Sequence, residues 1–285
     1  MKKQFEDKKV IVTGGAGGIG GVVAGGFLSE GAQVLVLDIN KKELKAKCKE
    51  LRKISPRISG LAVDVSDKKQ VKKTAIFIKN KFAGRIDVLV NAAGIYGPIG
   101  KFEEADLDFW RKTIEVNLVG TVNMCALVIP FMKKVRRGKI INFSGGGDGP
   151  SPRFTAYGSS KAAVLRFTES VADELSKYNI YVNAVSPGPV NTRFLDERLR
   201  AGIHKVGKDF YLASKKQKRE GGVSPTKVRD LILFLSSEKP KTLTGKMISA
   251  IHDDWENIPK HLNILNKTDI YNTRRIKPAD RNYDW

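Results

Sequence analysis

A tyrosine and a lysine four positions apart are the residues of this chain best suited to moving a proton. Tyr157 and Lys161 fall at the start of a helical pattern that covers residues 157–178. Side chains four positions apart lie on the same face of a helix. A phenol has an ordinary pKa of about 10, and a neighbouring ammonium group favours its ionised form. The pair is therefore suited to acid–base chemistry on an alcohol or a ketone, unless it is an ordinary contact on a helix surface.

A glycine-rich turn follows the first apolar run of the chain. Residues 10–12 lead into the turn Thr13-Gly14-Gly15-Ala16-Gly17-Gly18-Ile19-Gly20, after which a small, apolar helical pattern runs to residue 29. Glycines after a strand let the backbone approach a pyrophosphate, and the next helix offers free N–H groups to it. Such turns also form for purely steric reasons. We expect a dinucleotide to bind here, at Gly14, Gly18, Ile19 and Gly20.

A carboxylate 18 positions after the turn bears on the choice of dinucleotide. Asp38 ends the second apolar run. A carboxylate there accepts hydrogen bonds from the ribose hydroxyls and repels a 2′-phosphate. The positions where a basic residue would favour NADP hold Gly17 and Ile39. We therefore expect NAD rather than NADP, and Asp38 is also placed to cap the helix expected from Lys41.

The pattern of apolar residues predicts an α/β fold with a doubly wound parallel sheet of the Rossmann type, in a single domain with helices on both faces. Short apolar runs without alternation are typical of strands covered on both faces. Strands that alternate with helices need crossover connections, which such a sheet provides. We expect strands at 10–12, 34–37, 58–63, 86–90, 139–143 and 181–185. We expect helices at 19–29, 41–53, 68–82, 157–178 and, as one long helix or two joined ones, at 107–132.

Three segments follow from the change of composition along the chain. Residues 1–252 form the catalytic, dinucleotide-binding domain, and within it the long, charged segment at about 193–222 is expected to cover the substrate as a lid. Residues 253–285 are polar and aperiodic, so we expect an irregular tail. The tail is suited to be a substrate lid in which Arg274 and Arg275 clamp a phosphate or carboxylate, or it is a packing arm in an oligomer.

Composition argues against several other classes of protein. The 285 residues carry a net charge of +21, but the lysines are scattered and no basic block contains aromatic stacking residues, so nucleic-acid binding is not expected. Cys48 and Cys125 stand apart from each other and from histidine, which argues against a metal site or a disulfide framework. No apolar run approaches the roughly 20 residues of a membrane span. We expect a cytoplasmic protein without a membrane partner.

Six motifs in order, between about residues 8 and 250, make the chain resemble the short-chain dehydrogenase/reductase family. The resemblance implies catalytic roles for Asn117, Ser144, Tyr157 and Lys161. It implies that Tyr157 and Lys161 also contact the nicotinamide end of the cofactor. The other cofactor-binding positions that it implies are Asp64 and Val65 at the adenine, Asn91, Ala92 and Gly94 in the next motif, and Pro187, Gly188, Val190 and Thr192 beside the nicotinamide.

Two of these roles have competing interpretations. Ser144 precedes Tyr157 by 13 positions and is expected to polarise the substrate oxygen, but Gly145 follows it where the family usually has a second serine. Ser151 lies too far into the loop to be preferred. Asn117 is expected to hold a water in a proton relay to Lys161, or else it is a buried Asn that fixes the helix backbone.

The resemblance implies hydride transfer between a nicotinamide and a secondary alcohol or ketone, on a sugar or another polar, anionic substrate. A 3-oxoacyl-[acyl-carrier-protein] reductase is the alternative: the basic charge suits an acidic carrier protein, but Asp38 disfavours the NADPH of biosynthetic reductions. A non-catalytic, cofactor-sensing protein would commonly lack the Tyr157–Lys161 pair. The resemblance also implies a homodimer or homotetramer.

Overall fold

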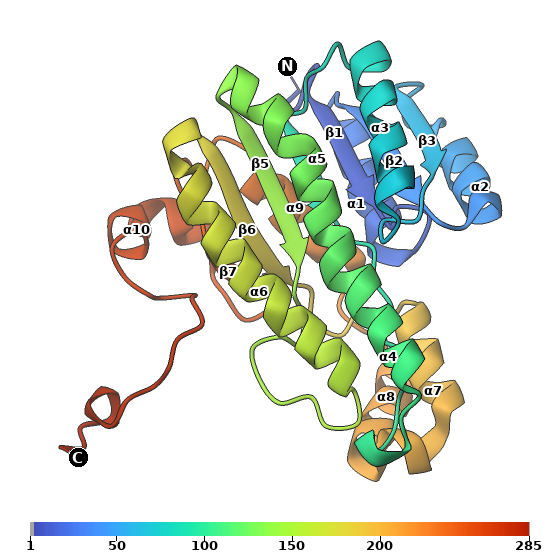
Figure 1. Ribbon diagram of the computed structural model, residues 1–285, viewed down its shortest axis with the longest axis vertical. Helices are drawn as coiled ribbons and strands as arrows, with labels where there is room; N and C mark the ends of the chain where they lie inside the picture. Colours follow the sequence, from blue (N-terminus) through green and yellow to red (C-terminus); the bar gives the residue numbers. More distant parts are fainter. Residues whose placement is uncertain (1–2, 285) are drawn as a thin grey trace.

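A seven-stranded parallel sheet forms the centre of the protein. The computed structural model describes residues 3–284. The sheet has the strand order β3-β2-β1-β4-β5-β6-β7, so the direction of winding reverses between β1 and β4. Figure 1 shows β1, β2 and β3 on one side of the sheet and β5, β6 and β7 on the other. The predicted doubly wound α/β fold is confirmed. The strands are β1 (Lys9–Thr13), β2 (Gln33–Asp38), β3 (Ile58–Ala62), β4 (Val88–Asn91), β5 (Gly138–Phe143), β6 (Ile180–Ser186) and β7 (Met247–Ser249).

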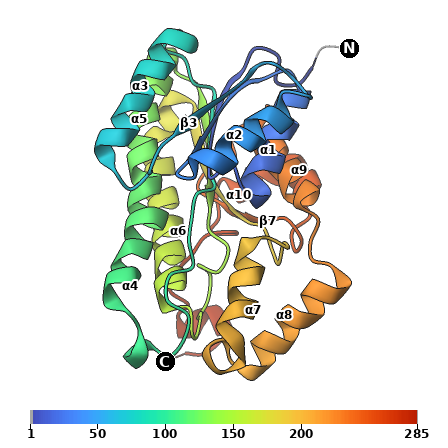
Figure 2. The ribbon, with the colours of Figure 1, turned by 90° about the vertical axis from the view of Figure 1, so that its right-hand side faces the viewer.

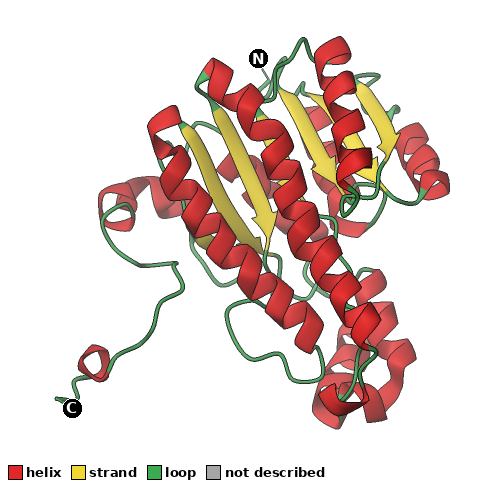
Figure 3. Cartoon of the chain, in the orientation of Figure 1, coloured by secondary structure: helices red, strands yellow, loops and turns green. Residues whose placement is uncertain are grey.

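Helices cover both faces of the sheet because its strands are apolar on both sides. Val10 and Val12 of β1 point into one apolar core and Ile11 points into the other. Figure 2 shows the two helical layers from the side, and Figure 3 shows the sheet between them. One layer holds α1 (Gly18–Ser29), α2 (Lys41–Leu51) and α9 (Pro225–Ser236); the other holds α3 (Lys68–Lys81), α4 (Leu107–Ile114), α5 (Gly120–Val135) and α6 (Thr155–Leu175).

The long helix expected at 107–132 is one continuous helix with a wide turn inside it. A π turn at Glu115–Val119 joins α4 to α5. Among the described residues, Leu107–Val135 is the one helix long and apolar enough to cross a membrane by length and composition, which differs from the expectation that no segment approaches that length. Here its inner face packs on the sheet through Met124, Val128 and Met132.

The segment predicted to be a lid folds into two helices below the carboxyl ends of the strands (Figure 1). α7 (Arg193–Val206) is interrupted at Gly202, and α8 (Lys208–Glu220) turns back along it after Gly207. Both glycines have positive φ, of 81° and 90°, which allows the sharp changes of direction. The segment therefore forms a helical hairpin.

The tail is less irregular than the sequence indicated. It contains α10 (Ile258–Leu265) and short 3₁₀ turns at Trp255–Asn257 and Pro278–Arg281. Ile258 and Leu265 are 3% and 4% exposed, so α10 packs into the core. Further on, the carbonyl of Tyr271 accepts a hydrogen bond of 2.9 Å from Met247 N and covers the outer edge of β7. The prediction failed here because eight helical residues are too few to show a clear period.

Candidate active site

A cavity of ≈ 1080 Å³ lies at the carboxyl ends of the strands and extends to the hairpin of α7 and α8, residues 193–222, which is named the lid hairpin after the sequence prediction. Its position at the switch between β1 and β4 is where doubly wound sheets bind ligands. Most of the residues predicted for the site line this cavity: Gly14, Gly18, Ile19, Gly20, Asp38, Asp64, Val65, Ala92, Gly94, Tyr157, Lys161, Pro187, Gly188, Val190 and Thr192. Asn91, Asn117 and Ser144 do not.

The glycine turn has the shape that a bound pyrophosphate needs. Gly14 has a φ of 63°, and a Cβ there would lie 2.8 Å from the Cα of Ala93, so only glycine fits. The hydroxyl of Thr13 accepts hydrogen bonds of 3.1 Å from the amides of Ala92 and Ala93, which fixes the two loops together. No side chain caps the start of α1, at Gly17. This leaves the N-terminus of the helix available to an anion in the cavity.

Asp38 stands on the cavity wall beside this turn. Its two carboxylate oxygens accept hydrogen bonds from Ala16 N at 3.1 Å and Asn40 N at 3.0 Å. It is Asn40 that caps α2, so the interpretation of Asp38 as the cap is wrong. The neighbouring Ile39 is 67% exposed and brings no positive charge. A fixed carboxylate at the end of β2 therefore fits a ribose with free hydroxyls.

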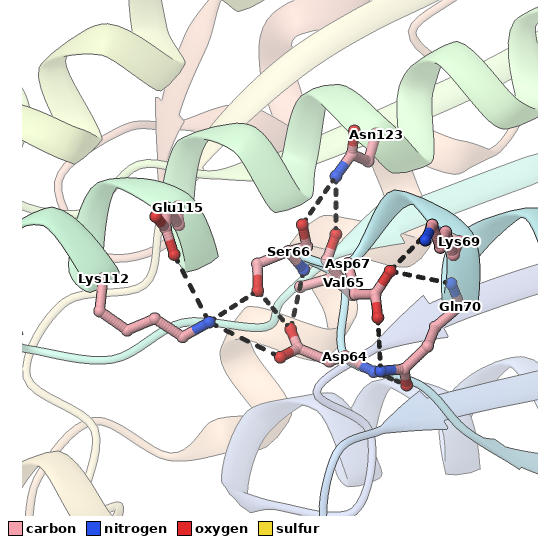
Figure 4. Close-up of polar contacts among 9 residues, drawn as sticks. All are labelled: Asp64, Val65, Ser66, Asp67, Lys69, Gln70, Lys112, Glu115 and Asn123. Carbon is pink, nitrogen blue, oxygen red and sulfur yellow. Dashed lines mark hydrogen bonds and ion pairs between the residues drawn. The ribbon is translucent and has the colours of Figure 1, made fainter.

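The next corner of the cavity is fixed by a small polar network (Figure 4). Asp64 accepts hydrogen bonds from the backbone N–H and hydroxyl of Ser66, at 2.9 and 2.6 Å. Lys112 reaches from α4 to lie 3.7 Å from the Asp64 carboxylate, and Asn123 from α5 donates to the Val65 carbonyl at 3.0 Å. These contacts hold Asp64 and Val65 at the wall, where the family resemblance expects the adenine.

Lys161 lies in the wall with only 4% of its surface exposed. Its ammonium group donates a hydrogen bond of 2.8 Å to the carbonyl of Phe143 at the end of β5. It lies 5.6 Å from the centre of the Tyr157 ring. Burial lowers the pKa of Lys161 to about 8. The two predicted catalytic side chains are thus brought together.

Burial has the opposite effect on the neighbouring phenol. It raises the pKa of Tyr157 above its ordinary value, and Tyr96 adds to this rise. The cation that opposes the rise is Arg198 of α7. The expected lowering of the Tyr157 pKa is therefore not found, and the phenol holds its proton at neutral pH.

Comparison with known proteins agrees with this geometry. The family model described as short chain dehydrogenase matches residues 8–201. The chain belongs to the short-chain dehydrogenase family. As a member of this family it is an oxidoreductase.

Relatives of this dehydrogenase cover nearly the same length of chain. The 3-oxoacyl-[acyl-carrier-protein] reductase of Thermotoga maritima is 35% identical over 248 residues, which are 86% of this chain and 96% of that protein. The NAD-dependent glycerol dehydrogenase of Listeria innocua is 34% identical over 242 residues, 84% of this chain and 91% of that protein. A solved structure of NAD⁺-bound xylitol dehydrogenase superposes with a TM-score of 0.80 at 26% identity, over 87% of this chain and 98% of that one.

Ser144 of the dehydrogenase does not occupy the predicted position. It is 0% exposed, and its hydroxyl donates a hydrogen bond of 3.1 Å to the backbone carbonyl of Lys161. The hydroxyl is turned to the backbone and Ser144 does not line the cavity, so the structure differs from the predicted position. Gly145 and Gly146 line the cavity instead, together with Ser151, whose hydroxyl contacts the Gly146 carbonyl at 3.1 Å.

Two predicted asparagines fix the frame of the dehydrogenase rather than line its cavity. Asn117, in the π turn, exchanges two hydrogen bonds of 2.9 Å with the backbone of Ile95 and donates a third to Ser160. Asn91 donates to the side chain of Asn142 at 2.9 Å and is buried, so its predicted cofactor contact is corrected. The side chain of Asn117 is therefore that of a buried, structural asparagine, which was the alternative to the proton-relay interpretation.

The substrate end of the cavity contains residues that the sequence did not single out. Aromatic rings gather around Tyr157: Tyr96 and Phe194 lie with ring centres 4.8 and 5.9 Å from it, and Phe154 contacts both Tyr96 and Phe210. Phe194 and Phe210 come from the lid hairpin, as does Arg198. Only the length and charge of residues 193–222 indicated a role at the site, because the aromatic residues are spread over the loop after β4, the start of α6, α7 and α8.

The tail of the dehydrogenase does not reach this cavity in the part of the chain that the structure describes. Arg274 forms ion pairs with Asp269 and Asp280, both in the tail itself. It lines a second cavity of ≈ 510 Å³, between α6, β7 and the tail. Figure 1 shows the tail leaving on the side of α6, away from α7 and α8. The expected clamp by Arg274 is therefore not formed in this arrangement.

Proposed function

We propose that this dehydrogenase uses NAD to transfer a hydride to or from a secondary alcohol or ketone of a polar substrate. One observation carries the proposal: Tyr157 and Lys161 share a single cavity with the glycine turn and Asp38. A nicotinamide dinucleotide bound there would accept or supply the hydride. The chain itself must then supply the proton transfer, the orientation of both ligands and the exclusion of water.

Tyr157 exchanges the proton with the substrate oxygen. Because burial raises its pKa, the phenol is protonated at neutral pH and is ready to act as an acid toward a ketone. Lys161 orients the ribose and carries positive charge into the wall. Ser151 takes the polarising role predicted for Ser144, since it belongs to the same loop and lines the cavity. For this its hydroxyl turns from the Gly146 carbonyl, to which it donates a hydrogen bond of 3.1 Å, to the substrate oxygen. Asn117 supports the pair by fixing the loop at Ile95.

The lid hairpin, residues 193–222, closes the substrate end. Gln217 of α8 donates hydrogen bonds to the carbonyl of Pro189 and the side chain of Asn191, at 2.8 and 2.9 Å. These contacts tie the lid to the loop expected beside the nicotinamide. A lid connected in this way couples the position of the substrate to that of the cofactor.

A 3-oxoacyl-[acyl-carrier-protein] reductase remains the second candidate, favoured by the Thermotoga maritima relative and by the net charge of +21. The polyol dehydrogenases among the relatives and Asp38 favour the first. We also propose a homodimer or homotetramer in the cytoplasm, on the family resemblance.

A comparison of cofactor affinities by calorimetry tests the proposal. Wild type should bind NAD on the order of tenfold or more tighter than NADP, since the Asp38 carboxylate repels a 2′-phosphate. Asp38→Ser should remove most of this preference. Glu50→Gln, which removes a carboxylate from the exposed face of α2, should keep it. Tighter binding of NADP by wild type would contradict our interpretation of Asp38.

A further inference from the structure

A buried arginine in the lid has no acidic partner. Arg198 lies on α7, is 7% exposed and lines the cavity. Within residues 3–284 it forms no ion pair, and its buried Nε has no hydrogen-bond partner. A guanidinium group taken out of water without a counter-charge is unfavourable for folding. Such a group is expected where a ligand supplies the missing charge.

The guanidinium group is nevertheless held in place from two sides. One terminal nitrogen donates a hydrogen bond of 3.0 Å to the side-chain oxygen of Gln217. The guanidinium carbon lies 4.9 Å from the centre of the Phe210 ring, so the group is fixed against an aromatic side chain. Because Gln217 also binds Pro189 and Asn191, the position of Arg198 is linked to the nicotinamide loop. Arg198 is therefore held in position, while its Nε–H group still lacks a hydrogen-bond acceptor.

The charges around Arg198 favour an anion at this end of the cavity. Arg153, Arg193 and Lys208 also line it there. Of the acidic neighbours along α7, Asp196 pairs with Lys218. Glu197 does not line the cavity and forms no ion pair with Arg198, although the charges of both residues act on Tyr96; burial raises the pKa of Glu197, which disfavours its charged form. The acidic residues that line the cavity are Asp38, Glu43 and Asp64 at the glycine-turn end and the exposed Asp209 in the lid.

We propose that Arg198 binds an oxyanion of the substrate, a carboxylate or a phosphate, so that the dehydrogenase acts on an anionic alcohol or ketone. This inference rests on the proposed function. The fork of N–H groups on Arg198 matches the geometry of both oxyanions. The ring wall of Tyr96, Phe194 and Phe210 packs against the carbon part of the substrate and directs its oxygen toward Tyr157.

Calorimetry with three ring compounds on the NAD-saturated protein tests this inference. Phenyl phosphate, benzoate and benzyl alcohol share the ring and differ in the group presented to Arg198. At constant ionic strength, wild type should bind one of the two anions on the order of tenfold tighter than benzyl alcohol. The anion that binds more tightly identifies the phosphate or carboxylate class.

Two variants on the same helix separate the site from general charge. Arg198→Gln should abolish the preference for the anion, whereas Arg200→Gln, which removes an exposed charge two positions away, should keep it. The NAD affinity of each variant shows that it is folded. An equal affinity of wild type for all three compounds, or a preference that survives Arg198→Gln, would overturn the inference. Failure of wild type to bind NAD would overturn the proposed function as well, whereas NAD binding without anion preference overturns this inference alone.

Discussion

The groups around Tyr157 shift its pKa in opposite directions. Burial and the Tyr96 ring raise its pKa, and the charge of Arg198 lowers it. Lys161 is itself less basic than usual because it is buried. The phenol is therefore protonated at neutral pH and suited to donate a proton to a carbonyl oxygen. In the oxidative direction, a bound oxidised nicotinamide would add positive charge, which favours removal of a proton from an alcohol.

Two matched variants test which serine polarises the substrate oxygen. Ser151→Ala should lower kcat by about 100-fold, because a cavity hydroxyl that stabilises developing charge has an effect of that order. Ser144→Ala removes a buried hydrogen bond to the Lys161 carbonyl and should lower stability by about 1 kcal/mol with a smaller effect on kcat. Steady-state kinetics of both variants check this. A larger loss of kcat in Ser144→Ala than in Ser151→Ala would reverse the assignment.

The shifted pKa of Lys161 makes stability depend on pH in a defined window. Its pKa is about 8 in the folded protein and 10.5 ordinarily. Between these values the unfolded chain binds the proton and the folded chain does not, so the free energy of unfolding rises with pH. From pH 8 to 9.5, wild type should gain about 2 kcal/mol more than Lys161→Met.

Urea unfolding at the two pH values measures this difference. Lys139 has a similarly lowered pKa, but it is present in both proteins and cancels in the comparison. Parallel pH dependences of wild type and Lys161→Met would show that Lys161 is not desolvated as the structure indicates.

Residue types and spacing located most of the site, but not the direction of each side chain. Tyr157, Lys161 and Asp38 could be predicted because motif and chemistry agree. Ser144 fitted the spacing, yet its hydroxyl turns to a backbone carbonyl behind the wall. Arg198 could not be predicted, because nothing in a charged segment distinguishes a buried arginine from exposed ones.

The elements around the site differ in how well their patterns identify them. The central strands could be predicted because apolar runs covered on both faces have a clear composition. β7 was missed since it has only three residues. The π turn inside α4–α5 leaves no mark on periodicity, although it places Asn117 against the loop at Ile95. The lid helices are interrupted at Gly202 and Gly207, which shortens their amphipathic patterns.

Two truncations test how much the tail contributes to the stability of the fold. Removal of residues 257–285 exposes the core around Ile258 and Leu265, and loss of these two side chains should lower the free energy of unfolding by roughly 3–6 kcal/mol. Removal of residues 274–285 keeps α10 and the cover of β7, so stability should change little. Denaturant melts of both proteins check this. Equal stability of the longer truncation and the full chain would show that α10 does not support the core.

At the scale of the whole molecule, one chain supplies both halves of the reaction site. The carboxyl ends of β1 and β2 present the glycine turn and Asp38, and the lid hairpin presents aromatic rings and Arg198. The tail packs on the opposite side, against α6 and β7 (Figure 1). Four of the cations, Arg153, Arg193, Arg198 and Lys208, line the lid end of the cavity, which composition alone did not indicate.

The most direct test of this account is the rate of NADH formation by the purified enzyme with a panel of alcohols, sugars and nucleotide sugars. On any substrate that wild type oxidises, Tyr157→Phe should lower the rate by about 1000-fold. The NAD affinity of this variant should stay within about threefold of wild type. Tyr178→Phe, which removes a phenol outside the cavity, should leave the rate unchanged. Full hydride transfer by Tyr157→Phe would contradict the account.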